Sequence, residues 1–466
     1  MGVIFNEAEA VWEWLMTHLI VINLLFSIII IFFQRRDPRS VWTWLFALNF
    51  IPVFGIIFYL LFGQDLKKSR MFKVKGISDR LNMPVKSQEE IIRSSDIPEE
   101  MMDPLIRDFR SLILYNLETS GAVLTTDNQV KIYTDGQAKF EGLRTALRRA
   151  SRFIHIQYYI IKNDEVFDSI VPILEDKVRE GVEVRILYDG MGGRFMPKRR
   201  WEELRRAGIL VGVFFPPILG WLNLRVNYRN HRKIVVIDGN VGFVGGFNIG
   251  REYISKDPGF GYWRDTHLRI TGEAVMSLQI RFALDWNYAT GENLFKNEAY
   301  FRTDLKKKTD VRRDKERPAW PDPELEGSQV GMQIIASGPD TREPHIRNNY
   351  LELFHKAKHH IYIQTPYFVP DDAIFSALKM AALSGVDVRL MIPCKPDHPF
   401  VYRATCSYAG ELLDYGAKVY IYTNGFLHSK GIMVDGRVCC YGTANMDIRS
   451  FELNFEVNAT IYDEAV

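Results

Sequence analysis

Two long apolar segments lie within the first 66 residues of the chain. Residues 14–33 and 41–62 each run for about 20 residues without Asp, Glu, Lys or Arg. An α-helix of that length is about 30 Å long, which matches the hydrocarbon layer of a bilayer. Three glutamates precede the first segment, where a cleaved signal peptide would carry basic residues. The pattern predicts a membrane anchor over 1–66, a transmembrane helical hairpin, with buried helices of a soluble domain as the alternative.

Basic residues follow both apolar segments, so the charge pattern leaves the topology of this anchor open. Three arginines follow the first segment within 35–39, and five lysines and arginines follow the second within 67–75. The positive-inside rule places both flanks in the cytoplasm, which two complete spans cannot satisfy. A re-entrant second segment is the alternative to a span, because polar or helix-breaking residues interrupt it: Asn49, Pro52 and Gly55. The more basic flank places the large domain behind it in the cytoplasm.

Beyond a polar connector over 67–118, the same order of strand and helix patterns occurs twice. Alternating apolar residues predict strands, and stretches with a 3.6-residue period predict helices between them. Strands that alternate with helices favour an α/β sandwich in each half. The matching stretches are 152–164 with 359–372, 181–189 with 385–393, and 265–275 with 456–466. We expect a first half over 119–302 and a second half over 330–466, joined by a charged linker over 303–329.

The repeat also predicts that the second half is truncated. After "GEAV" the first half continues with "MSLQIRFALDWNYATG", a candidate amphipathic helix. The second half stops at the equivalent point, Val466. We expect at least one further helix there.

Composition and charge change this picture little. The formal net charge of +2 does not indicate a dedicated nucleic-acid-binding protein. Local clusters of basic residues indicate solvated faces and linkers, and the alternative, more specific interpretation is attraction to anionic lipid. The four cysteines, at 394, 406, 439 and 440, show no CxxC spacing, so neither a disulfide framework nor a zinc site is predicted.

The strongest chemical signal is a stretch that occurs once in each half. "HRKIVVIDGNVGFVGGFN" begins at His231 and "HSKGIMVDGRVCCYGTAN" begins at His428. Both read His-x-Lys, four residues, Asp, six residues, Gly, two residues, Asn. Chance agreement at five fixed positions is expected in about 1 in 7,000 chains of this length at average composition. The candidate residues are His231, Lys233, Asp238 and Asn248 in the first half and His428, Lys430, Asp435 and Asn445 in the second.

Strand geometry separates the roles of these residues. Side chains two positions apart share a face, so each His and its Lys point the same way. The Asp lies five positions beyond the Lys and faces the other way, so we interpret Asp238 and Asp435 as structural. A carboxylate that orients each imidazole must then come from elsewhere. Asp265 and Glu456, at equivalent positions after the two motifs, are the candidates, with ordinary strand carboxylates as the alternative.

Two histidines, two lysines and two asparagines form a set that suits a phosphodiester. Lys and Asn donate hydrogen bonds to the non-bridging oxygens. One His attacks phosphorus and becomes a phosphohistidine, while the other protonates the leaving alcohol and deprotonates the incoming one. The lysines supply positive charge, and no acidic or histidine cluster has ligand spacing, so we expect neither a metal nor a cofactor. Each motif is therefore expected to be half of one active site.

The motifs resemble the "HKD" motifs of the phospholipase D superfamily, in which two copies build one pseudo-two-fold site. With the apolar segments, "LTTDNQVKIYTDGQAKFEGL" and "GTANMDIRSFELNFEVNA" extend the resemblance to bacterial cardiolipin synthases over essentially the whole chain. It implies that two phosphatidylglycerols give cardiolipin and glycerol. It also implies a multi-pass protein of the bacterial inner membrane. It also implies His231 as nucleophile, His428 as acid and base, and a structural motif Asp. Gly246 and Thr443 depart from the superfamily, where Ser is common; we expect Gly246 to let the backbone approach phosphate.

Other functions fit parts of the pattern. A hydrolytic phospholipase D, releasing phosphatidic acid, differs only in using water as the acceptor. A nuclease leaves the apolar segments without purpose, and an inactive membrane scaffold would have lost a motif residue. The metal-dependent cardiolipin synthases would need a DGxxAR-type motif, which is absent. Two stretches have open roles, namely 213–224 (lipid entry or core) and 394–408 (alcohol pocket or structural loop), and the sequence does not predict the oligomeric state.

Overall fold

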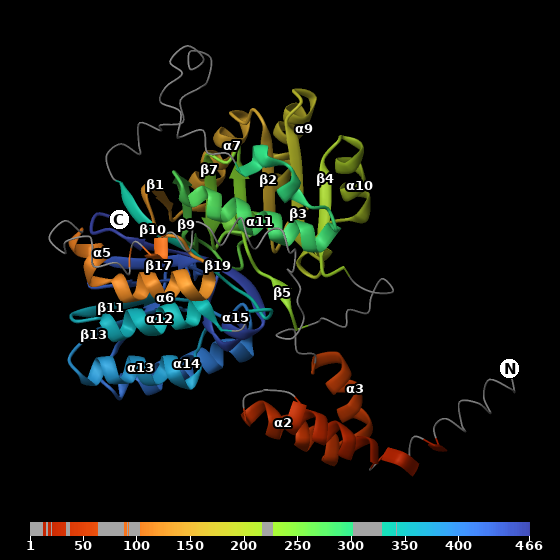
Figure 1. Cartoon of the computed structure of the whole chain (residues 1–466), viewed down its shortest axis with the longest axis vertical. Coiled ribbons are helices and arrows are strands. Elements are labelled where there is room, and N and C mark those ends of the chain that lie inside the picture. Colours follow the sequence, from red (N-terminus) through yellow and green to blue (C-terminus); the bar gives the residue numbers. More distant parts are fainter. Residues whose placement is uncertain are drawn as a thin grey trace, which may run out of the picture. The chain divides into compact units, whose positions relative to one another are not determined.

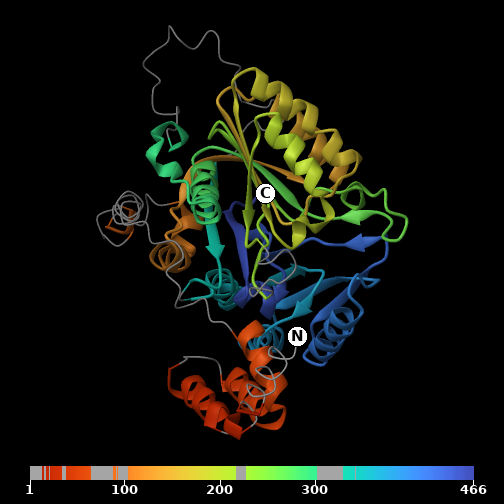
Figure 2. The same ribbon diagram turned by 90° about the vertical axis from the view of Figure 1, so that its right-hand side faces the viewer.

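The fold is taken from a computed structural model of the chain (Figure 1 and Figure 2). It describes residues 13–14, 17–19, 21–33, 38–63, 88–90, 92, 103–216, 227–301, 329–341 and 343–466. The predicted linker, apart from residue 329, lies outside these residues, as do most of the predicted connector before 103 and residues 217–224 of the apolar stretch before the first motif. The chain forms two compact units: residues 1–69 with 217–227, and residues 70–216 with 228–466.

In the first unit, both apolar segments contain helices. Residues 21–28 are helical and continue into η1 (Ile29–Phe33), and the second segment forms α2 (Pro38–Phe50) and α3 (Pro52–Phe62). The second segment is thus not one helix, because the helix is interrupted at Ile51 and α3 packs against α2. A Cβ atom at Gly55 would overlap the backbone of Ala47, so glycine permits this approach. No helix in the described part of the chain combines the length and the apolar composition needed to cross a bilayer.

The second unit contains one mixed sheet whose strand order is mirrored about its centre. The order is β14-β13-β11-β16-β17-β19-β10-β1-β9-β7-β6-β2-β3-β4, so β10 and β1 meet in the middle and each half continues with the equivalent strands. Each half combines parallel outer strands with antiparallel inner strands. The predicted duplication of an α/β unit is therefore confirmed.

The strands of the first half are β1 (Thr125–Tyr133), β2 (Phe153–Tyr158), β3 (Glu183–Asp189), β4 (Leu210–Phe214), β5 (Arg229–Asn230), β6 (Ile234–Ile237), β7 (Val241–Gly245), β8 (Trp263–Arg264) and β9 (His267–Thr271). Those of the second half are β10 (Val330–Ser337), β11 (His360–Gln364), β12 (Phe368–Val369), β13 (Asp387–Pro393), β14 (Lys418–Tyr422), β15 (Phe426–Leu427), β16 (Gly431–Val434), β17 (Val438–Gly442), β18 (Met446–Asp447) and β19 (Asn454–Tyr462).

The helices are α5 (Pro104–Asp108), α6 (Arg110–Ser120), α7 (Gly136–Arg148), α8 (Glu165–Asp168), α9 (Val171–Arg179), α10 (Lys198–Arg206), α11 (Ala274–Thr290), α12 (His345–Lys356), α13 (Asp372–Leu383), α14 (Pro399–Leu413) and α15 (Ile448–Glu452). Short 3-10 helices are η4 (Gly192–Phe195), η5 (Arg251–Ile254), η6 (Leu294–Lys296) and η7 (Glu298–Phe301).

Side-chain alternation along the strands assigns the helices to faces of the sheet. Ile154 and Ile156 of β2 pack in a core with α7, α9 and α10. The alternate residues His155 and Gln157 bond Gln279 and Asp285 of α11, which covers the opposite face. In the second half, the alternate residues of β11 remain half-buried: His360, Tyr362 and Gln364.

Helices α5 and α6 come from the predicted connector but pack in the core of the second half. Leu112 and Ile113 of α6 are buried with residues of α12 and β10, and Figure 1 shows α6 beside α12. Asn116 of α6 donates a hydrogen bond to Asn349 of α12 at 2.9 Å. The last part of the connector is therefore structural, and a segment that precedes the first half helps to complete the second.

Candidate active site

Each motif runs beside a strand of the other half. β5 is parallel to the start of β19, with Asn230 opposite Phe455, and His231 N then donates to Phe455 O at 3.0 Å. In the equivalent place β15 is parallel to β8, with Leu427 opposite Arg264, and His428 N donates to Arg264 O at 2.7 Å. The next residues along these strands are the two candidate acids. The backbone pairing therefore brings His231 beside Glu456 and His428 beside Asp265.

The carboxylate that contacts each imidazole consequently comes from the opposite half of the chain. His231 Nδ1 lies 3.0 Å from each carboxylate oxygen of Glu456, and His428 Nδ1 lies 2.6 Å from Asp265 Oδ2. Both acids are fully buried, whereas the side chains of His231 and His428 are 12% and 10% exposed. A carboxylate that accepts a hydrogen bond from Nδ1–H keeps the proton on that nitrogen and leaves the lone pair on Nε2, the nitrogen available for reaction.

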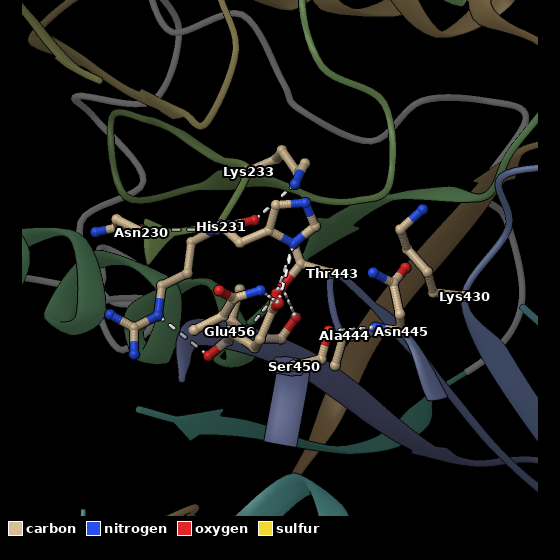
Figure 3. A network of polar contacts seen from close by, with 12 residues as sticks. Asn230, His231, Lys233, Lys430, Thr443, Ala444, Asn445, Ser450 and Glu456 are labelled. Atoms are coloured by element: carbon tan, nitrogen blue, oxygen red, sulfur yellow. Dashed lines mark hydrogen bonds and ion pairs between the residues drawn. The ribbon is translucent and has the colours of Figure 1, made fainter. Parts of the chain in front are cut away.

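The lysines and asparagines gather around the same point. Lys233 Nζ donates to His231 O at 2.7 Å, and Lys430 Nζ donates in the same way to His428 O. Asn248 Nδ2 donates to the Tyr253 hydroxyl at 3.0 Å, and Asn445 is likewise buried. Figure 3 shows Lys430 and Asn445 across from His231 and Lys233. The structure thus brings all six predicted His, Lys and Asn residues together.

Burial sets the charge states in this site. Together with the nearby lysines it lowers the pKa of His231 and of His428 to about 4, although the carboxylate beside each imidazole opposes the shift. Burial also lowers the pKa of Lys430 to about 8 and that of Lys233 well below its usual value. For Glu456 and Asp265 burial raises the pKa, but the neighbouring His and Lys residues outweigh it, so both remain low. At neutral pH the imidazoles are neutral and the acids are ionised.

The motif aspartates lie in turns, where they bind backbone groups. Asp238 accepts hydrogen bonds from Ser151 N, Arg152 N and Phe153 N at 2.8–2.9 Å. Asp435 accepts the equivalent bonds from Lys358 N, His359 N and His360 N at 2.8 Å. Both have φ of 55°, in the left-handed region, and each is followed by a glycine with positive φ. These carboxylates fix the hairpin within each motif, β6–β7 or β16–β17, to the start of β2 or β11.

Gly246 lies against the carboxylate of Asp265. A Cβ atom there would overlap Asp265 Oδ1, so the missing side chain makes room for the acid. Thr443, its equivalent, places its hydroxyl 2.9 Å from Val457 N, beside Glu456. Glycine is therefore required where the carboxylate of the first half lies close to the motif backbone.

Sequence reasoning missed three residues that hold the first motif in place. Arg232 bonds both carboxylate oxygens of Asp285 in α11 at 2.6 and 2.7 Å. Asp189, at the end of β3, accepts from Asn230 N at 2.8 Å, and the Tyr159 ring packs edge-on against His231. The strand period carried one usable signal, because it puts Arg232 on the face opposite His231 and Lys233, where a buried guanidinium needs an acidic partner.

The described residues contain no group of three or more His, Cys, Asp or Glu side chains arranged to bind a metal.

Comparison with known proteins gives consistent matches. Residues 143–260 and 350–466 match the model of a "Cardiolipin synthase, PLD-like domain", and residues 21–64 match a "Phospholipase_D-nuclease N-terminal" domain. A cardiolipin synthase of Listeria innocua is 45% identical over 97% of this chain and 89% of its own length. One of Staphylococcus aureus is 48% identical over 96% of this chain and 86% of its own. The fold is similar to that of phosphatidylserine synthase from Haemophilus influenzae, with a TM-score of 0.53 and 17% identity, over 72% of this chain and 82% of that one.

Proposed function

The chain belongs to the phospholipase D-like cardiolipin synthases, enzymes of the phosphatidyltransferase type, and from this premise we propose how its two histidines make cardiolipin. The substrates are two phosphatidylglycerols, and the products are cardiolipin and glycerol. The observation that carries the mechanism is the pair of imidazoles in one site, each held through Nδ1 by a buried carboxylate of the other half.

In the first step His231 Nε2 attacks the phosphorus of one phosphatidylglycerol. The P–N bond forms as the P–O bond to glycerol breaks, and His428 gives its proton to the leaving oxygen. The low pKa of His231 suits a nucleophile, which must be neutral to attack. The bound phosphodiester raises the pKa of the neighbouring His428, because a negative charge stabilises the imidazolium that acts as the acid.

In the second step a hydroxyl of the other phosphatidylglycerol attacks the phosphohistidine. The new P–O bond forms, the P–N bond breaks, and the hydroxyl proton returns to His428. Lys233, Lys430 and the two asparagines donate hydrogen bonds to the non-bridging oxygens in both transition states. These roles are supported by the burial of both lysines and by their position beside the imidazoles.

A product assay with full-length protein in detergent micelles tests the reaction. The donor is phosphatidylglycerol labelled in its head group and in one acyl chain, and EDTA is present. We expect cardiolipin with one glycerol released per turnover. Phosphatidic acid as the main product would identify a hydrolytic phospholipase D instead, and absence of any product would favour a scaffold.

Acid-quenched trapping tests the roles of the histidines. We expect His231→Ala to abolish the labelled phosphoenzyme, because the nucleophile is absent. His428→Ala should slow both its formation and its breakdown, because proton transfer typically contributes about 10²–10⁴-fold to such steps. A phosphoenzyme that neither substitution affects would contradict the two-histidine mechanism.

We also propose that the N-terminal segments hold the enzyme at a bacterial inner membrane, with the catalytic unit in the cytoplasm. Support comes from the uncharged stretches at 14–33 and 41–62 and from the basic residues that follow them. The break at Ile51 favours a re-entrant second segment over a complete span. Protease protection of tagged loops in sealed vesicles tests this topology: a re-entrant segment leaves the flanks near 36 and 70 on the same side.

A further inference from the structure

Tyr367 and Asp397 form a polar pair next to the second motif. β12 is parallel to β18, with Phe368 opposite Met446, so the residues just before them, Tyr367 and Asn445, lie side by side. Thr365 Oγ1 strengthens this contact, since it accepts from Met446 N at 3.1 Å and donates to Tyr367 O at 2.9 Å. The Tyr367 hydroxyl donates a hydrogen bond to Asp397, in the loop between β13 and α14.

This pair lies on the His428 side of the site. Lys430, two residues beyond His428, is close enough to Asp397 for the carboxylate to act on its pKa: burial lowers that pKa to about 8, while Asp265, Glu456 and Asp397 oppose the shift. Attack in line with the His231–phosphorus bond requires the alcohol to arrive from the side opposite His231. The pair is therefore near the path of the alcohol that leaves and of the alcohol that enters.

The groups presented here are hydrogen-bond acceptors. The carboxylate of Asp397 accepts only, and its side chain is 19% exposed. Asn445 is only 5% exposed, and its Oδ1 atom is buried without a hydrogen-bond partner among the described residues. The equivalent atom of the first half, Asn248 Oδ1, accepts from Ile160 N at 3.1 Å. A buried acceptor without a donor is costly, so this side of the site is suited to a ligand that brings hydroxyl groups.

We propose that Asp397 and Tyr367, together with Asn445 Oδ1, bind the vicinal diol of the glycerol head group and so select glycerol over simpler alcohols. One hydroxyl attacks phosphorus while its neighbour donates to the Asp397 carboxylate. The P–O bond forms, the P–N bond to His231 breaks, and the proton of the attacking hydroxyl goes to His428. This inference rests on the proposed function and names the group that the enzyme recognises in its acceptor.

Competition between alcohols tests the selection. Full-length protein in mixed micelles receives phosphatidylglycerol as donor, with labelled glycerol and 1-propanol as competing acceptors. The two products arise from a common phosphoenzyme, so their ratio does not depend on the fraction of active enzyme. We expect Asp397→Asn to lower the glycerol-to-propanol ratio about 10-fold and Tyr367→Phe to lower it about 3-fold, in line with loss of a charged and of a neutral hydrogen bond.

Asp414→Asn and Tyr415→Phe are the matched controls, since both residues lie beyond the far end of α14; they should leave the ratio unchanged. Ethanolamine as a third acceptor separates a diol site from a cation site. If Asp397→Asn selectively loses transfer to ethanolamine but keeps the glycerol-to-propanol ratio unchanged, the diol assignment is overturned. So would unchanged ratios in both Asp397→Asn and Tyr367→Phe. Failure of the wild-type protein to transfer to any alcohol would instead refute the proposed function.

Discussion

At the residue scale, the proposed chemistry depends on two contacts that cross between the halves. Glu456 holds His231, and Asp265 holds His428, each through Nδ1. The sequence predicts all four residues but not their pairing, because the two acids occupy equivalent positions in the repeat and the strand period does not say which half lies beside which. The parallel pairing of β5 with β19 and of β8 with β15 decides it, and short two-residue strands leave almost no sequence signal.

The crossed pairing predicts opposite responses to a donor that needs no acid catalysis. With phosphatidylglycerol, Glu456→Gln and Asp265→Asn should each slow phosphoenzyme formation by about 10²-fold or more, because the imidazole loses its orienting charge. With phosphatidyl-p-nitrophenol the leaving group departs without a proton. With this donor, Asp265→Asn should form the phosphoenzyme at close to the wild-type rate, whereas Glu456→Gln should remain slow. Single-turnover release of p-nitrophenol measures the difference, and equal recovery would contradict the assignment of His231 as nucleophile.

The pKa of Lys430 predicts an alkaline limit to activity. Burial lowers this pKa to about 8, so the ammonium is charged at pH 7 and loses its charge as the pH rises through about 8. Activity that depends on the charge should fall over the same range. Lys430→Arg keeps the charge at any accessible pH. We expect a lower rate but an alkaline limb moved upward by at least about one unit, in kcat/KM profiles from about pH 6 to 10. If the alkaline limb stays at the same pH in Lys430→Arg, the titration belongs to another group.

At the element scale, the turn within each motif stabilises the fold and takes no part in the proposed chemistry. Asp238 is 1% exposed and accepts from three backbone N–H groups, while Asp435 is only half-buried. Asn tolerates the positive φ but places an NH₂ group against those donors. Asp238→Asn should therefore lower the free energy of unfolding by about 2–4 kcal/mol and Asp435→Asn by less. Thermal unfolding measures both, and the protein that remains folded should keep its kcat.

The elements follow the sequence where apolar residues alternate along a strand. The alternation in 152–164 and 359–372 predicts β2 and β11, and their similarity predicts equivalent places in the two halves. The sequence does not predict the role of α6, since its apolar residues fit a solvent-facing connector as well as a core. Hydropathy alone does not reveal that residues 41–62 bend at Ile51; the sequence signal is Pro52, which is compatible with the first turn of a new helix.

At the scale of the whole molecule, the mirrored sheet joins the two halves into one continuous structure, which we expect to unfold cooperatively. β1 and β10 pair at its centre, and α6 is buried in the second half. All four cysteines belong to the second half, and Cys440 is fully buried. A thiol reagent can reach Cys440 only when the structure around it unfolds. The rate of Cys440 labelling under native conditions therefore reports unfolding of the second half alone or of the entire catalytic unit.

Ile186→Ala, in β3 of the first half, should increase the rate of Cys440 labelling. Removing this fully buried side chain costs about 2–5 kcal/mol, and in a cooperative unit the opening of both halves becomes easier by that amount. Leu390→Ala, at the equivalent position of β13, is the matched variant that acts on the second half directly. Labelling accelerated by Leu390→Ala but not by Ile186→Ala would show that the halves open independently.

The exchanged acids also bear on how such a chain can evolve. A duplicated segment ordinarily frees one copy to drift, since the other still performs the original task. Under the proposed mechanism neither copy can drift alone: a change at Glu456 is expected to disable the histidine of the other repeat, and a change at Asp265 to do the same in return. The same contacts are compatible with a dimer of identical chains that each supply an acid to the other, and fusion of two such chains would make that mutual dependence permanent.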